Sequence, residues 1–228
     1  MADHFSKGVL RFAINLGNPV LAHSDAAGQP GGLTVALAER IADALGYQAQ
    51  YRTWPTAGDV VSAGARGEWD IAFLARDPQR ETTLRFTDSY ITIQGTMLVR
   101  AEAAFTTVRQ MDEAAISINV GKGAAYDLWL TRNFTQAKLN RRGSSQAAIA
   151  AFLHGEGSAA AGIRQPLEET ARQHSGYRVL QDNFMQIHQA VCTPLGDRRF
   201  DTALAALVIH LKQTGEMAQL IDANLRDE

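Results

Sequence analysis

The chain has 228 residues, of which 46% are hydrophobic and 20% charged, and its formal net charge is −2. This length suits one large domain or two lobes of roughly 100 residues each. Lys and Arg number 22 against 24 Asp and Glu, so no basic surplus exists to neutralise a phosphate backbone, and nucleic-acid binding is not expected. A single cysteine, Cys192, excludes an internal disulfide and a multi-cysteine metal cluster. The histidines show no zinc-site spacing, so no metal is expected. The Gly-rich turn at 121–126 is neither a Walker A loop nor a dinucleotide fingerprint, and no cofactor is expected.

Strand and helix patterns alternate along the first third of the chain. Leu33, Leu37, Ile41 and Leu45 recur at steps of four, which is the apolar stripe of an amphipathic helix, and Gly46 suits its C-cap. Short apolar or β-prone runs flank this helix, and the alternation indicates a parallel α/β sheet. The expected elements are a strand at 10–14, a helix at 33–45, a strand at 51–54, a helix at 60–66 and a strand at 70–75.

The same alternation returns after a β-prone stretch at 91–99, and a second such stretch at 186–193 brings the chain back. We therefore expect two α/β lobes joined by a two-strand hinge, with lobe 1 formed by 1–93 and 189–228 and lobe 2 by 94–188. Ser144 is a suitable N-cap for one helix of the second lobe. The other expected elements are a strand at 116–120, a helix at 124–134, strands at 159–163 and 177–180, and helices at 200–213 and 216–225.

Motifs in order along nearly the whole chain resemble the bacterial extracellular solute-binding protein family 3, the amino-acid-type periplasmic binding proteins of ABC importers. The resemblance implies a periplasmic-binding-protein type II fold and no enzyme activity. It also implies that a small polar organic anion or amino-acid-like solute binds in the cleft between the lobes and passes to permease subunits in the membrane, the protein being a monomer. The matching segments are Leu10–Ala13 with Asn18-Pro19, Gly31–Ala38, Gly67–Ala72, Arg80 six residues before Phe86, and Val120 with Gly123.

Two features carry the expected ligand chemistry. A carboxylate favours a bidentate guanidinium and the free N–H groups of a helix N-terminus. Arg80 occupies the position of the family's carboxylate-binding arginine; on the sequence alone it also reads as a surface arginine in a turn. Gly121–Tyr126 reads either as a plain strand-to-helix turn or as an anion-binding turn, a role that its position in the family favours. The ligand-binding residues implied by the resemblance are Asn15, Asn18, Trp54, Ala75, Arg76, Arg80, Lys122, Gly123, Ala124, Ala125, Tyr126 and Arg164.

Departures from the family pattern bear on the ligand. The family's acidic residue after the first strand and its loop aromatic fall on Asn15 and Asn18, and Ile163 and Arg164 stand where an aspartate usually holds the ligand's ammonium. A buried ammonium without a carboxylate is costly, so a small organic anion fits better than an ordinary α-amino acid. Arg164 reads equally as a solvated residue at the start of a helix.

Alternatives of other classes stay open. The same fold serves as a ligand-sensing module without a transport role. It also resembles some dehydratases, in which Glu168 or Glu169 would have to act as general acid. The first eight residues contain no apolar segment of a signal peptide. Either a signal has been removed and the protein is periplasmic, as the family implies, or it stays in the cytoplasm.

Overall fold

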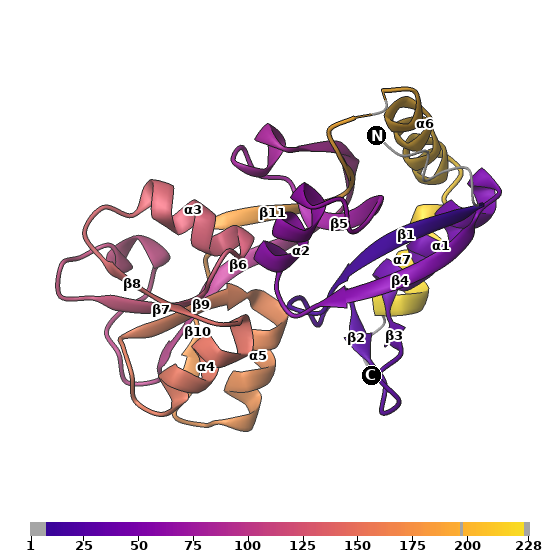
Figure 1. The fold of residues 1–228 in the computed structure, drawn as a ribbon. Helices are drawn as coiled ribbons and strands as arrows, with labels where there is room; N and C mark the ends of the chain where they lie inside the picture. Colours follow the sequence, from indigo (N-terminus) through magenta and orange to yellow (C-terminus); the bar gives the residue numbers. More distant parts are fainter. Residues whose placement is uncertain (1–7, 197, 226–228) are drawn as a thin grey trace. The chain divides into compact units, whose positions relative to one another are not determined.

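The computed structural model describes residues 8–196 and 198–225, so the N-terminal segment discussed above lies almost wholly outside the described residues. The chain divides into two compact units, with unit 1 formed by Met1–Ile91 and Gln189–Glu228 and unit 2 by Thr92–His188. The chain passes between them twice, in β6 (Leu84–Arg100) and in β11 (Met185–Pro194) (Figure 1). The boundary expected at the first crossing, after residue 93, falls two residues later than this division.

Unit 1 is built on parallel strands with β1 in the centre, between β4 and β5. The return strand β11 pairs antiparallel with β5 on its other side. The strands are β1 (Val9–Asn15), β4 (Gln48–Trp54) and β5 (Ile71–Ala75), with a short hairpin of β2 (His23–Ser24) and β3 (Pro30–Gly31). The helices are α1 (Leu33–Leu45), α2 (Ala57–Ala65), the 3-10 turn η2 (Arg80–Thr82), α6 (Arg198–Gln213) and α7 (Glu216–Leu225).

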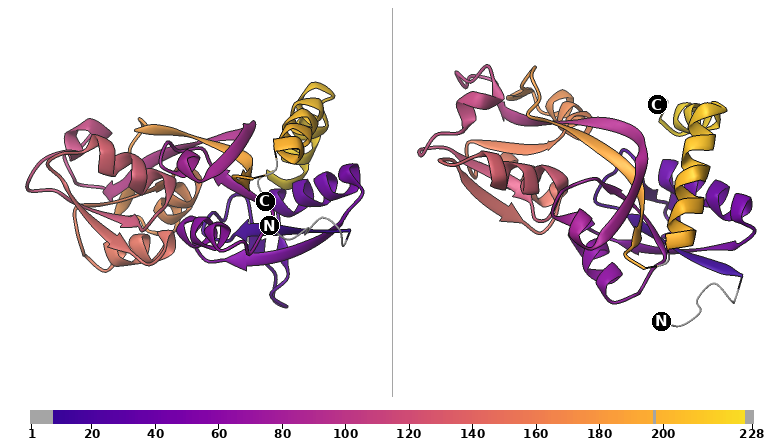
Figure 2. Two further views of the ribbon diagram at one scale, coloured as in Figure 1. Left: turned by 45° about the horizontal axis from the view of Figure 1, so that its top comes forward. Right: turned by 90° about the horizontal axis from the view of Figure 1, so that it is seen from above.

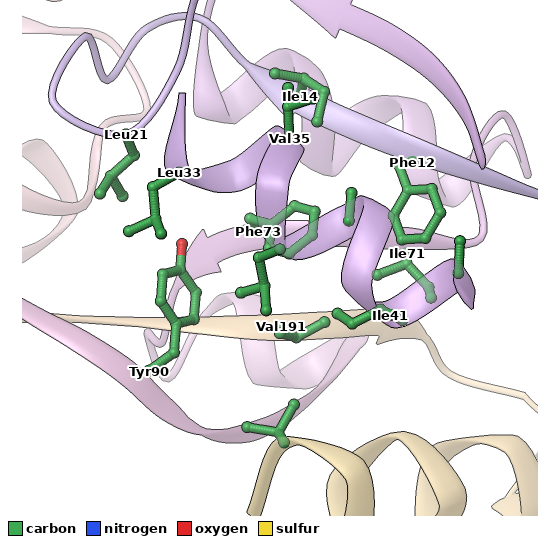
Figure 3. Packing of buried hydrophobic residues seen from close by; sticks show 14 of the residues in the cluster. Phe12, Ile14, Leu21, Leu33, Val35, Ile41, Ile71, Phe73, Tyr90 and Val191 are labelled. Atoms are coloured by element: carbon green, nitrogen blue, oxygen red, sulfur yellow. The ribbon is translucent and has the colours of Figure 1, made fainter. Parts of the chain in front are cut away.

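Neighbouring residues of a strand point to opposite faces of the sheet. Since both faces of the unit 1 sheet carry apolar side chains, helices cover both. Phe12 and Ile14 pack into the cluster formed with α1, which Figure 3 shows, whereas Ala13 between them packs into the cluster formed with α2 and the buried Trp69. The stripe of α1 predicted from the sequence is buried in the first cluster. Helices α6 and α7 contact each other and α1 on that side (Figure 2).

Unit 2 repeats the design. Strand β7 lies between β8 and β9, all three parallel, and β9 continues antiparallel to β6. The strands are β7 (Ser117–Gly121), β8 (Lys138–Arg142), β9 (Ala159–Ile163) and β10 (Tyr177–Val179), which pairs with β6. The helices are the 3-10 turn η3 (Val108–Met111), α3 (Ala125–Asn133), α4 (Ser145–Leu153) and α5 (Arg164–Gln173).

Local signals placed most of these elements correctly. Ser144 is the N-cap of α4, since its hydroxyl accepts the Ala147 N–H at 3.0 Å. The sequence did not indicate β8, because Lys138–Arg142 has three basic residues and no apolar alternation; it pairs on one side only, with β7. Strand β6 begins at Leu84, earlier than the stretch expected at 91–99.

Cys192 lies in β11 opposite Ala72 of β5 and has no exposed surface. It packs into the cluster formed with α2 and Trp69. Burial raises the pKa of its thiol, and the nearby Arg80 guanidinium only partly opposes that rise. The thiol is therefore protonated and inert at neutral pH.

Candidate functional site

Three parallel strands of unit 1 end at the same edge of the sheet, where ligands of open α/β sheets bind. Asn15, Trp54 and Ala75 are the last residues of β1, β4 and β5. Asn15 lies opposite Trp54 in the β1–β4 register, and the next N–H, of Leu16, donates to the Trp54 carbonyl at 2.9 Å. The structure thus gathers these predicted residues of lobe 1 at one edge.

The two asparagines after β1 differ in what their side chains do. Asn15 Oδ1 accepts the Gly17 N–H at 2.9 Å and so holds the turn. The Asn18 side chain is only 5% exposed, and neither Nδ2 nor Oδ1 has a hydrogen-bond partner among the described residues. Its backbone carbonyl, in contrast, accepts the N–H groups of Leu21 and Ala22. The loop is therefore fixed through its backbone, and the Asn18 carboxamide keeps its full hydrogen-bonding capacity.

Arg80 brings a buried positive charge to this edge. It lies in η2, is 3% exposed, and donates from a terminal nitrogen to the Ala75 carbonyl at 3.0 Å. Burial lowers the pKa of its guanidinium, while the Asp77 carboxylate raises it. An arginine keeps its charge at neutral pH in spite of such burial. The alternative of a solvated surface arginine does not fit this position.

Arg76 has a different environment from Arg80, although the two are close in sequence. Its Nε and one terminal nitrogen donate to Glu81 Oε1 at 3.1 and 2.9 Å, and its side chain is 47% exposed. Exposed ion pairs of this kind contribute little to stability. Ligand contact by Arg76 stays a prediction.

The parallel strands of unit 2 also end at one edge, where three helices begin. The N-cap of α3, Ala124, has no side chain that could cap the helix. The first N–H groups of a helix have no acceptor within it, so those of Ala125 and Tyr126 are available to an anion. Gly123, in the turn before them, has φ +74°, a conformation that favours glycine.

The side chain of Tyr126 makes its hydrogen bonds inside unit 2. The ring is buried, its hydroxyl donates to Ser145 Oγ at 2.8 Å, and it accepts the Gly121 N–H at 3.3 Å. These bonds join the α3 turn to the start of α4. Because the hydroxyl is engaged, Tyr126 can offer a ligand its backbone N–H. Lys122 is exposed, and its N–H donates to the Arg142 carbonyl at 2.9 Å.

Asp127 is a residue of this turn that the sequence analysis missed. Its buried carboxylate accepts the Gly123 N–H at 2.9 Å and the Arg141 Nε at 3.0 Å. An acidic residue in the first turn of a helix is a recognisable signal, since it complements the positive helix end. Here Arg141 neutralises the added charge, which leaves the α3 N-terminus attractive to an anion.

Arg164, at the start of α5, is engaged throughout by its own unit. Its guanidinium donates to Gln94 Oε1 at 2.7 Å, to Glu168 Oε1 at 3.3 Å, and to three backbone carbonyls of 180–182 at 3.0 to 3.3 Å. A guanidinium carries five N–H donors, so none is left over in this arrangement. Its side chain is 18% exposed. The geometry therefore favours a clamp inside unit 2 over the predicted ligand contact.

The same helix holds the carboxylates considered as general acids. Glu168 is paired with Arg164, and Glu169 is exposed. Hydrogen bonds from Arg172 and then Gln173 lower the pKa of the Glu169 carboxyl. A general acid needs its pKa raised toward the working pH, so the geometry does not favour the dehydratase alternative.

Two hollows lie within single units, away from most of these residues. One of about 240 Å³ in unit 1 lies beside α6 and contains the Arg85–Asp201 ion pair. One of about 420 Å³ in unit 2 lies between α5 and β10 and includes Arg164. Among the described residues, no group of three or more His, Cys, Asp or Glu is placed to hold a metal ion.

Two α/β units, each with groups suited to an anion where its parallel strands end, and two chain crossings between them are the architecture of a two-lobed solute-binding protein of the type II periplasmic fold. The chain belongs to the bacterial extracellular solute-binding proteins, family 3, whose family model matches residues 10–226. No curated protein sequence matches the chain.

Solved structures show the same fold at low sequence identity. A cysteine-binding protein from Campylobacter jejuni superposes with a TM-score of 0.84 and 22% identity, covering 97% of this chain and 90% of that one. An amino acid ABC transporter substrate-binding protein from Streptococcus pneumoniae, bound to L-arginine, gives 0.82 and 19%, covering 97% and 96%. An ancestral amino acid-binding protein, a precursor of cyclohexadienyl dehydratase, gives 0.82 and 18%, covering 97% of both chains.

Family membership fixes the general role. Members bind small molecules outside the cytoplasm and work with ABC transporters, and the similar structures are mostly binding proteins. Across the described residues, no helix combines the length and apolar character needed to cross a membrane.

Proposed function

We propose that this chain binds a small organic anion or amino-acid-like solute between its two lobes and delivers it to the permease of an ABC importer. In this proposal it acts in the periplasm as a monomer. The observation that carries it is the buried Arg80 guanidinium at the edge where β1, β4 and β5 end. Amino acids named for the similar structures support the class of solute.

The binding chemistry follows from the two edges. A carboxylate pairs with a guanidinium through charge-assisted hydrogen bonds, and burial strengthens such a pair because water does not screen it. The uncapped start of α3 offers N–H groups and the positive end of the helix dipole to the same kind of group. Each lobe thus supplies groups suited to an anion, and the proposal is that one solute uses both.

The first experiment is thermal unfolding with a panel of amino acids and organic acids, followed by titration calorimetry of each hit. A solute present at 100 times its Kd stabilises by about 2.7 kcal/mol. For 228 residues this raises Tm by roughly 5–6 °C. A panel that gives no shift contradicts the proposal.

Variants of two arginines locate the site. Arg80→Lys keeps a charge and loses the planar fork, so we expect Kd to rise about 10- to 100-fold, as for loss of a hydrogen bond to a charged group. Arg66→Lys is the matched control, because Arg66 lies in an exposed ion pair with Glu68 and outside the predicted site, and its Kd should stay within about twofold. Equal losses in both variants would contradict the assignment of Arg80.

Delivery is a separate step with its own test. Uptake of the labelled solute is compared in cells that contain or lack the chain's coding sequence. Lower uptake without the chain is the expected result. Unchanged uptake, with binding intact, would instead favour a sensing role. Sedimentation of the free chain tests whether it is a monomer.

A further inference from the structure

An unpaired carboxamide inside unit 1 needs an explanation. The Asn18 side chain is 5% exposed, and both of its polar atoms lack a partner among the described residues. Burying such a group without a hydrogen-bond partner destabilises the folded chain. Nothing in the loop requires the amide, since the turn is held by Asn15 Oδ1 and by backbone hydrogen bonds. The group is therefore placed for a partner that the unit itself does not supply.

Carboxylates near the two strand edges are, in contrast, already engaged. They lie in the loops and first helical turns that follow β4, β5, β7 and β9. An incoming ammonium would have to share or displace an existing partner. The carboxylates and their partners are Asp59 with Thr56, Asp77 with the Gln79 N–H, Glu81 with Arg76, Asp127 with Gly123 and Arg141, and Glu168 with Arg164.

Each strand edge also carries a positively charged or partly positive group. Arg80 is a buried cation, and the α3 N-terminus adds a partial positive charge without a capping side chain. Each of these groups by itself suits a carboxylate and repels an ammonium, which is costly to bury without a carboxylate beside it.

We propose that the solute is an amine-free carboxylic acid with a neutral hydroxyl or amide group where an α-amino acid carries its ammonium, and that Asn18 recognises this neutral group. The proposal rests on the proposed function and names the solute class of that site. A carboxamide both donates and accepts, so it pairs with a hydroxyl or an amide in either direction. An ammonium can only donate, which would leave the Asn18 NH₂ unpaired.

Matched pairs of 2-hydroxy acids and α-amino acids test the class. L-Lactate is compared with L-alanine, L-malate with L-aspartate, and 2-hydroxyisocaproate with leucine, by calorimetry on the full chain. We expect the hydroxy acid of at least one pair to bind ten times more tightly or better, which corresponds to about 1.4 kcal/mol. Tighter binding of the amino acids overturns this inference and leaves the proposed function standing. No binding across the whole panel overturns both.

Substitutions at Asn18 test the residue. Asn18→Asp supplies the missing carboxylate, and we expect the preference within a pair to shift at least tenfold toward the amino acid. Asn224→Asp on α7 is the matched control, because that exposed carboxamide donates to the Leu220 carbonyl of its own helix, and the preference should stay within about twofold. A shift of equal size in both variants, or no shift in Asn18→Asp, overturns the assignment.

Asn18→Ala separates solute recognition from a resident water. If Asn18 contacts the solute, its loss raises the Kd of the hydroxy acid about fivefold or more, as for a neutral hydrogen bond. A Kd within twofold of the wild-type value means that the amide holds water only, and this overturns the proposal. Circular dichroism and a melting curve for each variant show that the affinity is that of folded protein.

Discussion

Replacing Arg164 by Lys separates its two interpretations, a clamp inside unit 2 or a contact for the solute. Lysine keeps the charge but loses the planar fork that reaches Gln94 and the carbonyls of 180–182 together. We expect two to four of the hydrogen bonds to be lost, at about 1 kcal/mol each. The expected loss of unfolding free energy is therefore about 2–4 kcal/mol.

Melting curves measure this loss directly. An unfolding entropy of about 2.1 cal/mol/K per residue, over 228 residues, converts the loss into a fall in Tm of roughly 4–8 °C. Arg172→Lys is the matched control on the same helix, because that side chain is 71% exposed. Its Tm should fall by no more than about 1 °C.

Two results would refute the clamp. One is a Tm for Arg164→Lys within about 1 °C of the wild-type value. The other is a tenfold rise in the Kd of the solute with stability unchanged, which would assign the guanidinium to the ligand. The expected result is the reverse, a lower Tm with Kd changed by less than about threefold.

Three further variants test the two units. Tyr126→Phe leaves the Ser145 hydroxyl and a buried N–H without their partner and should cost about 1–3 kcal/mol in urea unfolding; a cost below 0.5 kcal/mol contradicts the contact. Gly121→Ala places a Cβ 2.8 Å from the Ser145 backbone nitrogen and should cost about 1–3 kcal/mol by overpacking, so an unchanged urea midpoint would argue against this close approach. Asp112 tests pH dependence: burial pushes its pKa up, but backbone N–H groups of 135–137 hold it below 3.8. Its contribution is present above the unfolded pKa and lost as pH falls through the folded one, so Asp112→Asn should flatten the acid limb of stability below about pH 4, and an unchanged limb contradicts this.

Much of the fold could be predicted because its signals are local. The stripe from Leu33 to Leu45 identifies α1, and the apolar run before Ala75 identifies a strand buried on both faces. Strand β8 was not predicted. It lies at the edge of the sheet, where Lys138–Arg142 pairs with one neighbouring strand only. An edge strand needs no apolar run, so its sequence reads as a loop.

The candidate site was harder to predict from the sequence, because the role of each side chain depends on its burial and on its hydrogen-bond and ion-pair partners. Arg76 and Arg80 cannot be told apart by their local sequence, yet Arg76 is in an exposed ion pair and Arg80 is buried. The composition around Arg164 gave no hint that loop carbonyls would engage its guanidinium. Asn18 reads as an ordinary turn residue before a proline, and its unpaired carboxamide emerges only in three dimensions.

The sealed thiol of Cys192 has a practical consequence. It is the chain's single cysteine and has no exposed surface, so the folded protein behaves toward maleimide reagents as if it contained none. One cysteine engineered on each unit would then accept a dye without background labelling. Energy transfer between the two dyes would report the distance between the units in solution, with and without solute, on the wild-type core.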